Sequence, residues 1–117
     1  MKQIVAWVNK ADKKEFEKYT NANIYFAASL EDFEKHINSD CIPVFSLVLA
    51  ASTYKKVKKI TSTHPEIMFY FLQKRRIGLA VKTNELFLRG DENTEPRVML
   101  PEDIITLSGS QVIEETK

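Results

Sequence analysis

The side chains that could perform acid–base, nucleophilic or metal chemistry are few and widely spaced. The chain of 117 residues has two histidines, His36 and His64, and a single cysteine, Cys41. This spacing does not form a metal-ligand motif. Ser46 lies in an apolar run that predicts a strand, without the glycine-flanked turn that exposes a hydrolase nucleophile. None of the three glycines opens a phosphate-binding loop. We therefore expect neither catalysis nor a bound cofactor or metal ion.

Basic side chains gather in the middle third of the chain. Residues 53–90 hold nine lysines and arginines against two acidic residues, whereas residues 91–117 hold two against seven. An anionic partner could bind the basic segment, the acidic segment could lie over it, or the two could form separate solvated surfaces. The candidate contacts for a partner or an anion are Lys55, Lys56, Lys58, Lys59, Lys74, Arg75 and Arg76.

Length and composition are typical of one globular domain. A hydrophobic content of 44% is ordinary for a chain of this size, so we predict a single domain over residues 1–117 with a frayed tail at 109–117. The apolar run at 3–8 is too short for a signal peptide, and no run approaches a membrane span. A cytoplasmic protein that does not enter membranes is expected. Cys41 precedes apolar neighbours, which favours a small buried side chain.

Strand and helix patterns alternate through the first two-thirds of the chain. Short continuous apolar runs are typical of strands buried on both faces of a parallel sheet, and apolar residues recur at helical spacing between them. Ser29, three residues before Asp32, resembles a capping box that starts a helix. Because parallel strands joined by helices cross over right-handed, we predict an open, mainly parallel α/β sheet in the order 2-1-3-4, flanked by helices. The predicted strands cover residues 4–8, 24–28, 42–51 and 67–72.

The segment after the fourth predicted strand allows two interpretations. Residues 77–88 can form two strands around a turn at 83–85, or a helix followed by a fifth strand at 86–88. The polar residues 91–97 are typical of a loop. Pro101, followed by two acidic residues, predicts a helix start.

The residues that follow the predicted strands matter most for function. In open α/β sheets, binding and chemistry lie beyond the carboxyl ends of the strands. Asp12 lies near the first of these ends, where we interpret it as a helix-start acid rather than a metal ligand. The first predicted strand ends in Asn9-Lys10, the third in Leu49-Ala50-Ala51 and the fourth in Leu72-Gln73, and Arg89-Gly90 follows the fifth strand at 86–88.

Two segments of the chain, residues 22–37 and 55–70, resemble strand and helix regions of response-regulator receiver domains. The resemblance implies a flavodoxin-like fold. Receiver domains place an acidic pair after the first strand, a phosphate-accepting Asp after the third, a Ser or Thr after the fourth and a Lys after the fifth. The carboxylates hold magnesium, and the other groups bind and neutralise the phosphoryl group. Asn9-Lys10 and Leu49-Ala50 depart from this pattern, so the resemblance implies a degenerate pseudo-receiver without phosphoacceptor or metal site.

A second, shorter resemblance concerns the C-terminal third. Residues 79–90, with 98–107 beyond them, resemble the opening strands of a LytTR-type DNA-binding domain, and the chain ends before the DNA-reading elements of such a domain. This resemblance favours the hairpin over residues 77–88 and the ancestry of a bacterial-type regulator.

These patterns together predict a non-catalytic signalling domain that binds another protein, a second copy of itself included. Receiver domains signal through the surface around their fourth helix and fifth strand, which corresponds here to residues 74–89. An apolar surface that carries arginine is typical of protein interfaces. The alternative is a nucleic-acid-binding transcriptional regulator that uses the basic middle segment. A small-molecule pocket at the strand ends has no residue signature.

Overall fold

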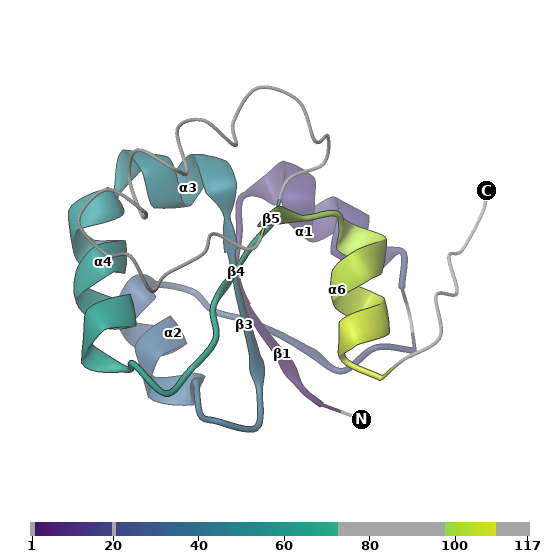
Figure 1. The fold of residues 1–117 in the computed structure, drawn as a ribbon. Helices are drawn as coiled ribbons and strands as arrows, with labels where there is room; N and C mark the ends of the chain where they lie inside the picture. Colours follow the sequence, from purple (N-terminus) through teal and green to yellow (C-terminus); the bar gives the residue numbers. More distant parts are fainter. Residues whose placement is uncertain (1, 20, 73–97, 110–117) are drawn as a thin grey trace.

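The computed structural model describes residues 2–19, 21–72 and 98–109, which form a five-stranded, all-parallel sheet covered by helices (Figure 1). The strand order is β2-β1-β3-β4-β5. The predicted α/β class and the order 2-1-3-4 are therefore confirmed, and the fifth strand extends the sheet in parallel. The strands are β1 (Ile4–Trp7), β2 (Ile24–Phe26), β3 (Ile42–Ser46), β4 (Tyr70–Leu72) and β5 (Val98–Met99).

Helices cover both faces of the sheet because successive strand residues point to opposite sides. Val5 and Phe45 pack on the face covered by α2 (Leu30–His36), α3 (Leu47–Ser52) and α4 (Tyr54–Thr63). Ile4 and Val44 pack on the other face, where α1 (Lys10–Glu17) and α6 (Pro101–Leu107) supply buried residues. In Figure 1, α2 and α4 accordingly lie to one side of the strands and α6 to the other.

Aromatic rings fill the core on the α2–α4 face. The Phe45 ring lies 4.6 Å from that of Phe33, 5.8 Å from that of Phe71 and 5.9 Å from that of Phe69, measured between centroids. Trp7 meets the same ring edge-on at 6.4 Å. Phe45 is fully buried, so the central strand anchors this half of the core.

The third strand is shorter than its apolar run predicts. The run from Ile42 was expected to continue as a strand to Ala51, and this is wrong, because β3 ends at Ser46 and α3 begins at Leu47. Leucine and alanine are strong helix formers, and the buried residues Leu47 and Ala50 are three apart, which is helical spacing. An apolar run alone does not distinguish a buried strand from a buried helix.

Pro43 is accommodated within the central strand by the lengths of its neighbours. On the β1 side it lies opposite Val5, while β4 pairs with β3 only from Val44 onward. The missing N–H of Pro43 therefore leaves no gap in the pairing with β4.

The predicted helix ends agree with the structure. Ser29 caps α2 by accepting a hydrogen bond from the Asp32 backbone N–H at 3.0 Å, and α4 ends before His64. α6 begins at Pro101. Cys41 is buried, as predicted.

Several predictions fall on residues 73–97 and 110–117, outside the described ranges. These are the choice between hairpin and helix over 77–88, the loop at 91–97, and all of the frayed tail except Gly109. Among the helices of the described ranges, none is long and apolar enough to cross a membrane.

Candidate functional site

The carboxyl ends of β1 and β3 lie side by side because these strands are neighbours in the sheet. After β1 the chain turns into α1 through Asn9, the residue that caps this helix. After β3 it enters α3 directly, with Ser46 as both the last strand residue and the helix cap. Asn9 and Ser46 therefore meet at the edge where open α/β sheets bind their ligands.

Three hydrogen bonds join Asn9, Ser46 and Asp12 into one unit, named here the Asn9–Ser46–Asp12 triangle. The Asp12 backbone N–H donates to Asn9 Oδ1 at 2.8 Å. The Asn9 backbone N–H donates to Ser46 Oγ at 2.9 Å, and the Ser46 hydroxyl donates to Asp12 Oδ2 at 2.6 Å. In an ordinary capping box the acid would accept directly from the cap N–H, whereas here the Ser46 hydroxyl is inserted between them.

Two of the three residues of the triangle are almost closed to solvent, and Asn9 is half-buried. Ser46 is 0% exposed and Asp12 is 8% exposed. The short O–H···O contact to a carboxylate is typical of a charge-assisted bond, which is stronger than a neutral one. The bond between the Ser46 hydroxyl and the Asp12 carboxylate therefore joins the start of α1 to the end of β3.

The residue at the end of the third strand differs from the prediction. Leu49, Ala50 and Ala51, predicted at the end of the third strand, belong to α3, and Ser46 takes that position. Asp12 lies in the first turn of α1, as predicted, and in addition bonds Ser46 across 34 residues of sequence. A serine that divides a β-branched run from a leucine–alanine run was the available signal for this junction.

A metal site can also form from residues that are distant in sequence but close in space, which local spacing does not reveal. Within residues 2–19, 21–72 and 98–109, no three His, Cys, Asp or Glu side chains gather closely enough to hold a metal ion. Of the three residues of the triangle, Asp12 alone carries a carboxylate, and its Oδ2 accepts from the Ser46 hydroxyl.

A second polar cluster lies where α2 packs beside the edge strand β2. The Tyr25 hydroxyl donates to Asp32 Oδ2 at 2.7 Å, and the Ala28 backbone N–H donates to the same oxygen at 3.0 Å. These two bonds, the backbone one first, hold the pKa of the Asp32 carboxyl below its ordinary value. The same Asp32 bond raises the pKa of Tyr25.

Both histidines pair with carboxylates on α2. His36 Nδ1 lies 3.1 Å from Asp32 Oδ1, and its ring stacks on Tyr25 with centroids 4.0 Å apart. His64 Nε2 lies 3.1 Å from Glu34 Oε2, which joins the end of α4 to α2. The two histidines thus stabilise separate contacts of α2.

The structure describes four of the seven basic residues predicted to contact a partner. Lys55, Lys56 and Lys59 are exposed on α4, and Lys58 is half-buried. Tyr54, at the start of the same helix, is 39% exposed. Lys74, Arg75 and Arg76 lie outside the described ranges, so a continuous positive edge that includes them stays a prediction.

Comparison of the chain with protein-family models, with curated proteins and with solved structures found no match. The receiver-like and LytTR-like resemblances therefore stay hypotheses.

Proposed function

We propose that this chain is a non-catalytic regulatory domain that acts by binding another protein, on a receiver-like scaffold that lacks the phosphoryl switch. The observation that carries the proposal is the Asn9–Ser46–Asp12 triangle. It occupies the carboxyl ends of β1 and β3, where a receiver-like switch needs acidic metal ligands and a phosphate acceptor.

Burial argues against phosphoryl chemistry at the triangle. A phosphoryl group on Ser46 Oγ would replace the hydroxyl proton that is donated to Asp12 and would place new negative charge beside that carboxylate. The site has no room for this without opening the junction, because Ser46 is fully buried.

The exposed helical surface carries apolar side chains suited to contact. Val48 on α3 is 56% exposed, Tyr54 on α4 is 39% exposed and Leu107 on α6 is 41% exposed. Single exposed apolar residues are common on protein surfaces, so these residues mark positions to test rather than an interface in themselves.

Nuclear magnetic resonance of the ¹⁵N-labelled chain tests the absence of switch chemistry. Addition of magnesium with acetyl phosphate or beryllofluoride is expected to leave the amide signals of Asn9, Asp12 and Ser46 unchanged. Saturable shifts at these amides, together with a phosphate adduct in the intact mass spectrum, would contradict the proposal.

Site-specific photocrosslinking in cells that naturally express the chain tests the binding role. A photoreactive phenylalanine analogue is placed in turn at Lys14 on α1, Lys35 on α2, Tyr54 on α4 and Leu107 on α6. A protein adduct of defined mass is expected from one surface and not from the others. Equal adducts at all four positions, or none, would contradict a protein-binding role.

A further inference from the structure

We propose that the outward face of α4 binds an acidic segment of the partner protein. This face is formed by Lys55, Lys56, Lys58 and Lys59 with Tyr54, and is named here the α4 lysine face. The inference rests on the proposed protein-binding function and adds to it the surface and the chemistry of the partner.

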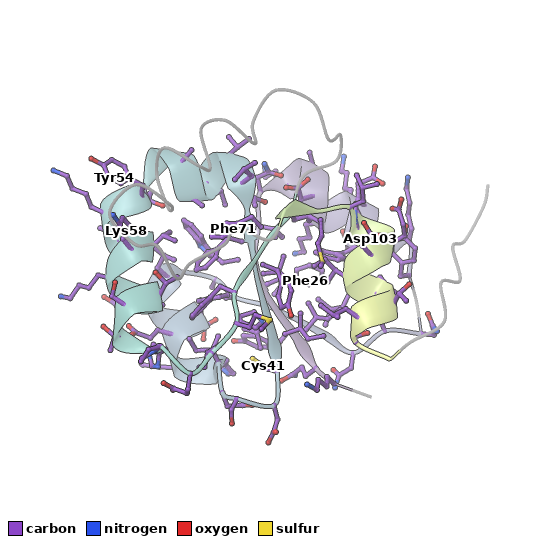
Figure 2. The ribbon with its side chains drawn as sticks, viewed as in Figure 1. Phe26, Cys41, Tyr54, Lys58, Phe71 and Asp103 are labelled. Carbon is purple, nitrogen blue, oxygen red and sulfur yellow. The ribbon has the colours of Figure 1, made fainter. Side chains whose placement is uncertain are left out.

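The packing of α4 determines which side chains face outward. Val57 and Ile60 are buried in the core beneath the helix. At 100° per residue, Lys55 and Lys59 lie on the opposite side, and Lys58 and Tyr54 follow each other on one flank. Figure 2 shows Tyr54 and Lys58 on the same outer side of α4. Lys56 lies on the other flank, so Lys55 and Lys59 form the centre of the outward side and Lys58 and Lys56 lie on either side of them.

The charges on this face lack internal compensation. α4 contains no acidic residue, and none of its four lysines forms an ion pair within the described ranges. On α1, by contrast, Lys18 pairs with Glu15 at 3.2 Å. Within the described ranges, the positive charge of these four lysines is therefore not balanced by an ion pair.

This arrangement lowers the stability of the helix itself. Lysines three or four residues apart repel one another, and Lys55 and Lys56 lie in the first turn, where the helix dipole is already positive. The Thr53 side chain does not cap this end, because its hydroxyl donates to the Leu49 carbonyl oxygen at 2.7 Å. An acidic partner would reduce the repulsion between the lysines and would interact favourably with the positive end of the helix dipole. Binding of such a partner would therefore offset the cost of placing four lysines on this helix.

The surroundings of the face favour a short acidic peptide segment over a nucleic acid. Ten helical residues span about 15 Å, which is room for few phosphate contacts. At the C-terminal end of α4, Glu34 pairs with His64, and Glu66 is exposed just beyond. An extended phosphate backbone would meet these carboxylates, whereas a short segment can end before them. Tyr54 adds a ring of the kind enriched in protein interfaces.

Titration of the full chain with defined probes tests the inference by nuclear magnetic resonance. The probe is a short amphipathic peptide of glutamates and leucines, compared with the same peptide carrying glutamine for glutamate. The acidic peptide is expected to shift the amide signals of residues 54–63, and the glutamine peptide is not. Shifts spread over all helices, or none on α4, would overturn the inference.

Matched variants separate this face from general charge attraction. Lys55→Gln with Lys59→Gln is expected to weaken peptide binding about tenfold, the effect of two exposed ion pairs. Lys10→Gln with Lys14→Gln makes the same change at the same spacing on α1 and is expected to alter binding by less than about twofold. Equal losses from both pairs would refute a specific site.

Three further outcomes test the role of the Tyr54 ring, the class of partner, and this inference separately from the proposed function. Tyr54→Ala is expected to weaken peptide binding at high salt as well as at low salt, and an effect confined to low salt would refute a docking role for the ring. Tighter binding of a short DNA duplex than of the acidic peptide, lost on Lys55→Gln with Lys59→Gln, would overturn the inference in favour of a nucleic-acid partner. Photocrosslinks from α1, α2 or α6 but not from Tyr54 would refute the α4 lysine face and leave the protein-binding function intact.

Discussion

Replacement of Ser46 by alanine removes the central member of the Asn9–Ser46–Asp12 triangle and is expected to destabilise the fold strongly. The variant loses the buried charge-assisted bond to Asp12 Oδ2 and the acceptor of the part-buried Asn9 N–H. Hydrogen bonds to charged groups contribute about 1.5–3 kcal/mol, and the loss of the acceptor for a part-buried donor adds about 1 kcal/mol. We therefore expect the free energy of unfolding to fall by about 3 kcal/mol.

Equilibrium unfolding in urea measures this change. With a urea dependence of about 1.5 kcal/mol/M, the midpoint should fall by about 2 M. Ser52→Ala is the matched control, because Ser52 is exposed and its hydroxyl donates only to the Leu49 carbonyl oxygen. That change should cost less than about 0.5 kcal/mol. A Ser46→Ala midpoint within the same small range would refute the structural role of the triangle.

A double-mutant cycle identifies the pair responsible. If the bond between Ser46 and Asp12 carries the effect, Asp12→Ala should cost much less in the Ser46→Ala background than in the wild type. The expected coupling free energy is about 1–2 kcal/mol. Additive effects would show that the two side chains act independently.

Four further predictions concern other parts of the core and surface. Tyr25→Phe should raise the pKa of Asp32 in a carbon-detected titration, because the carboxylate loses a donor; an unchanged pKa would contradict the bond. The pKa of Asp32 in the folded protein lies below its unfolded value of about 3.9. The ionised Asp32 carboxylate therefore stabilises the fold above that pH, and this stabilisation is lost as the pH falls through the folded pKa. Asp32→Asn should thus destabilise the protein at pH 7 and not in strong acid. Burial raises the pKa of the Cys41 thiol, so its reaction with a disulfide reagent at mildly alkaline pH should be much slower than that of a free thiol, and an equal rate would contradict its burial. Phe45→Ala should lower the free energy of unfolding by about 3–5 kcal/mol in urea titration, and a loss below about 1 kcal/mol would contradict its central packing.

The sheet order could be predicted because it depends on patterns that are local in sequence. Short apolar runs separated by helical spacing leave few parallel arrangements once crossovers are right-handed. The helix starts at Ser29 and Pro101 were also predictable, because capping residues act on backbone groups within three or four positions.

The strand-end site could not be predicted in the same way. The run 42–51 is apolar throughout most of its length, and burial on all sides removes the periodicity that distinguishes helix from strand. Asp12 had a sufficient local role as a helix-start acid, and its bond to Ser46 depends on β1 and β3 being neighbours. The position of Ser46 became clear only when the end of β3 was known.

The outermost strands of the described sheet are short, with three residues in β2 and two in β5. An outer strand offers unpaired N–H and C=O groups to other chains, and a long flat edge is a template for intermolecular β-sheet growth. Edges this short can form few such bonds. The described edges of the sheet therefore offer few backbone groups to a strand of another chain, including when many nascent copies are crowded together during synthesis.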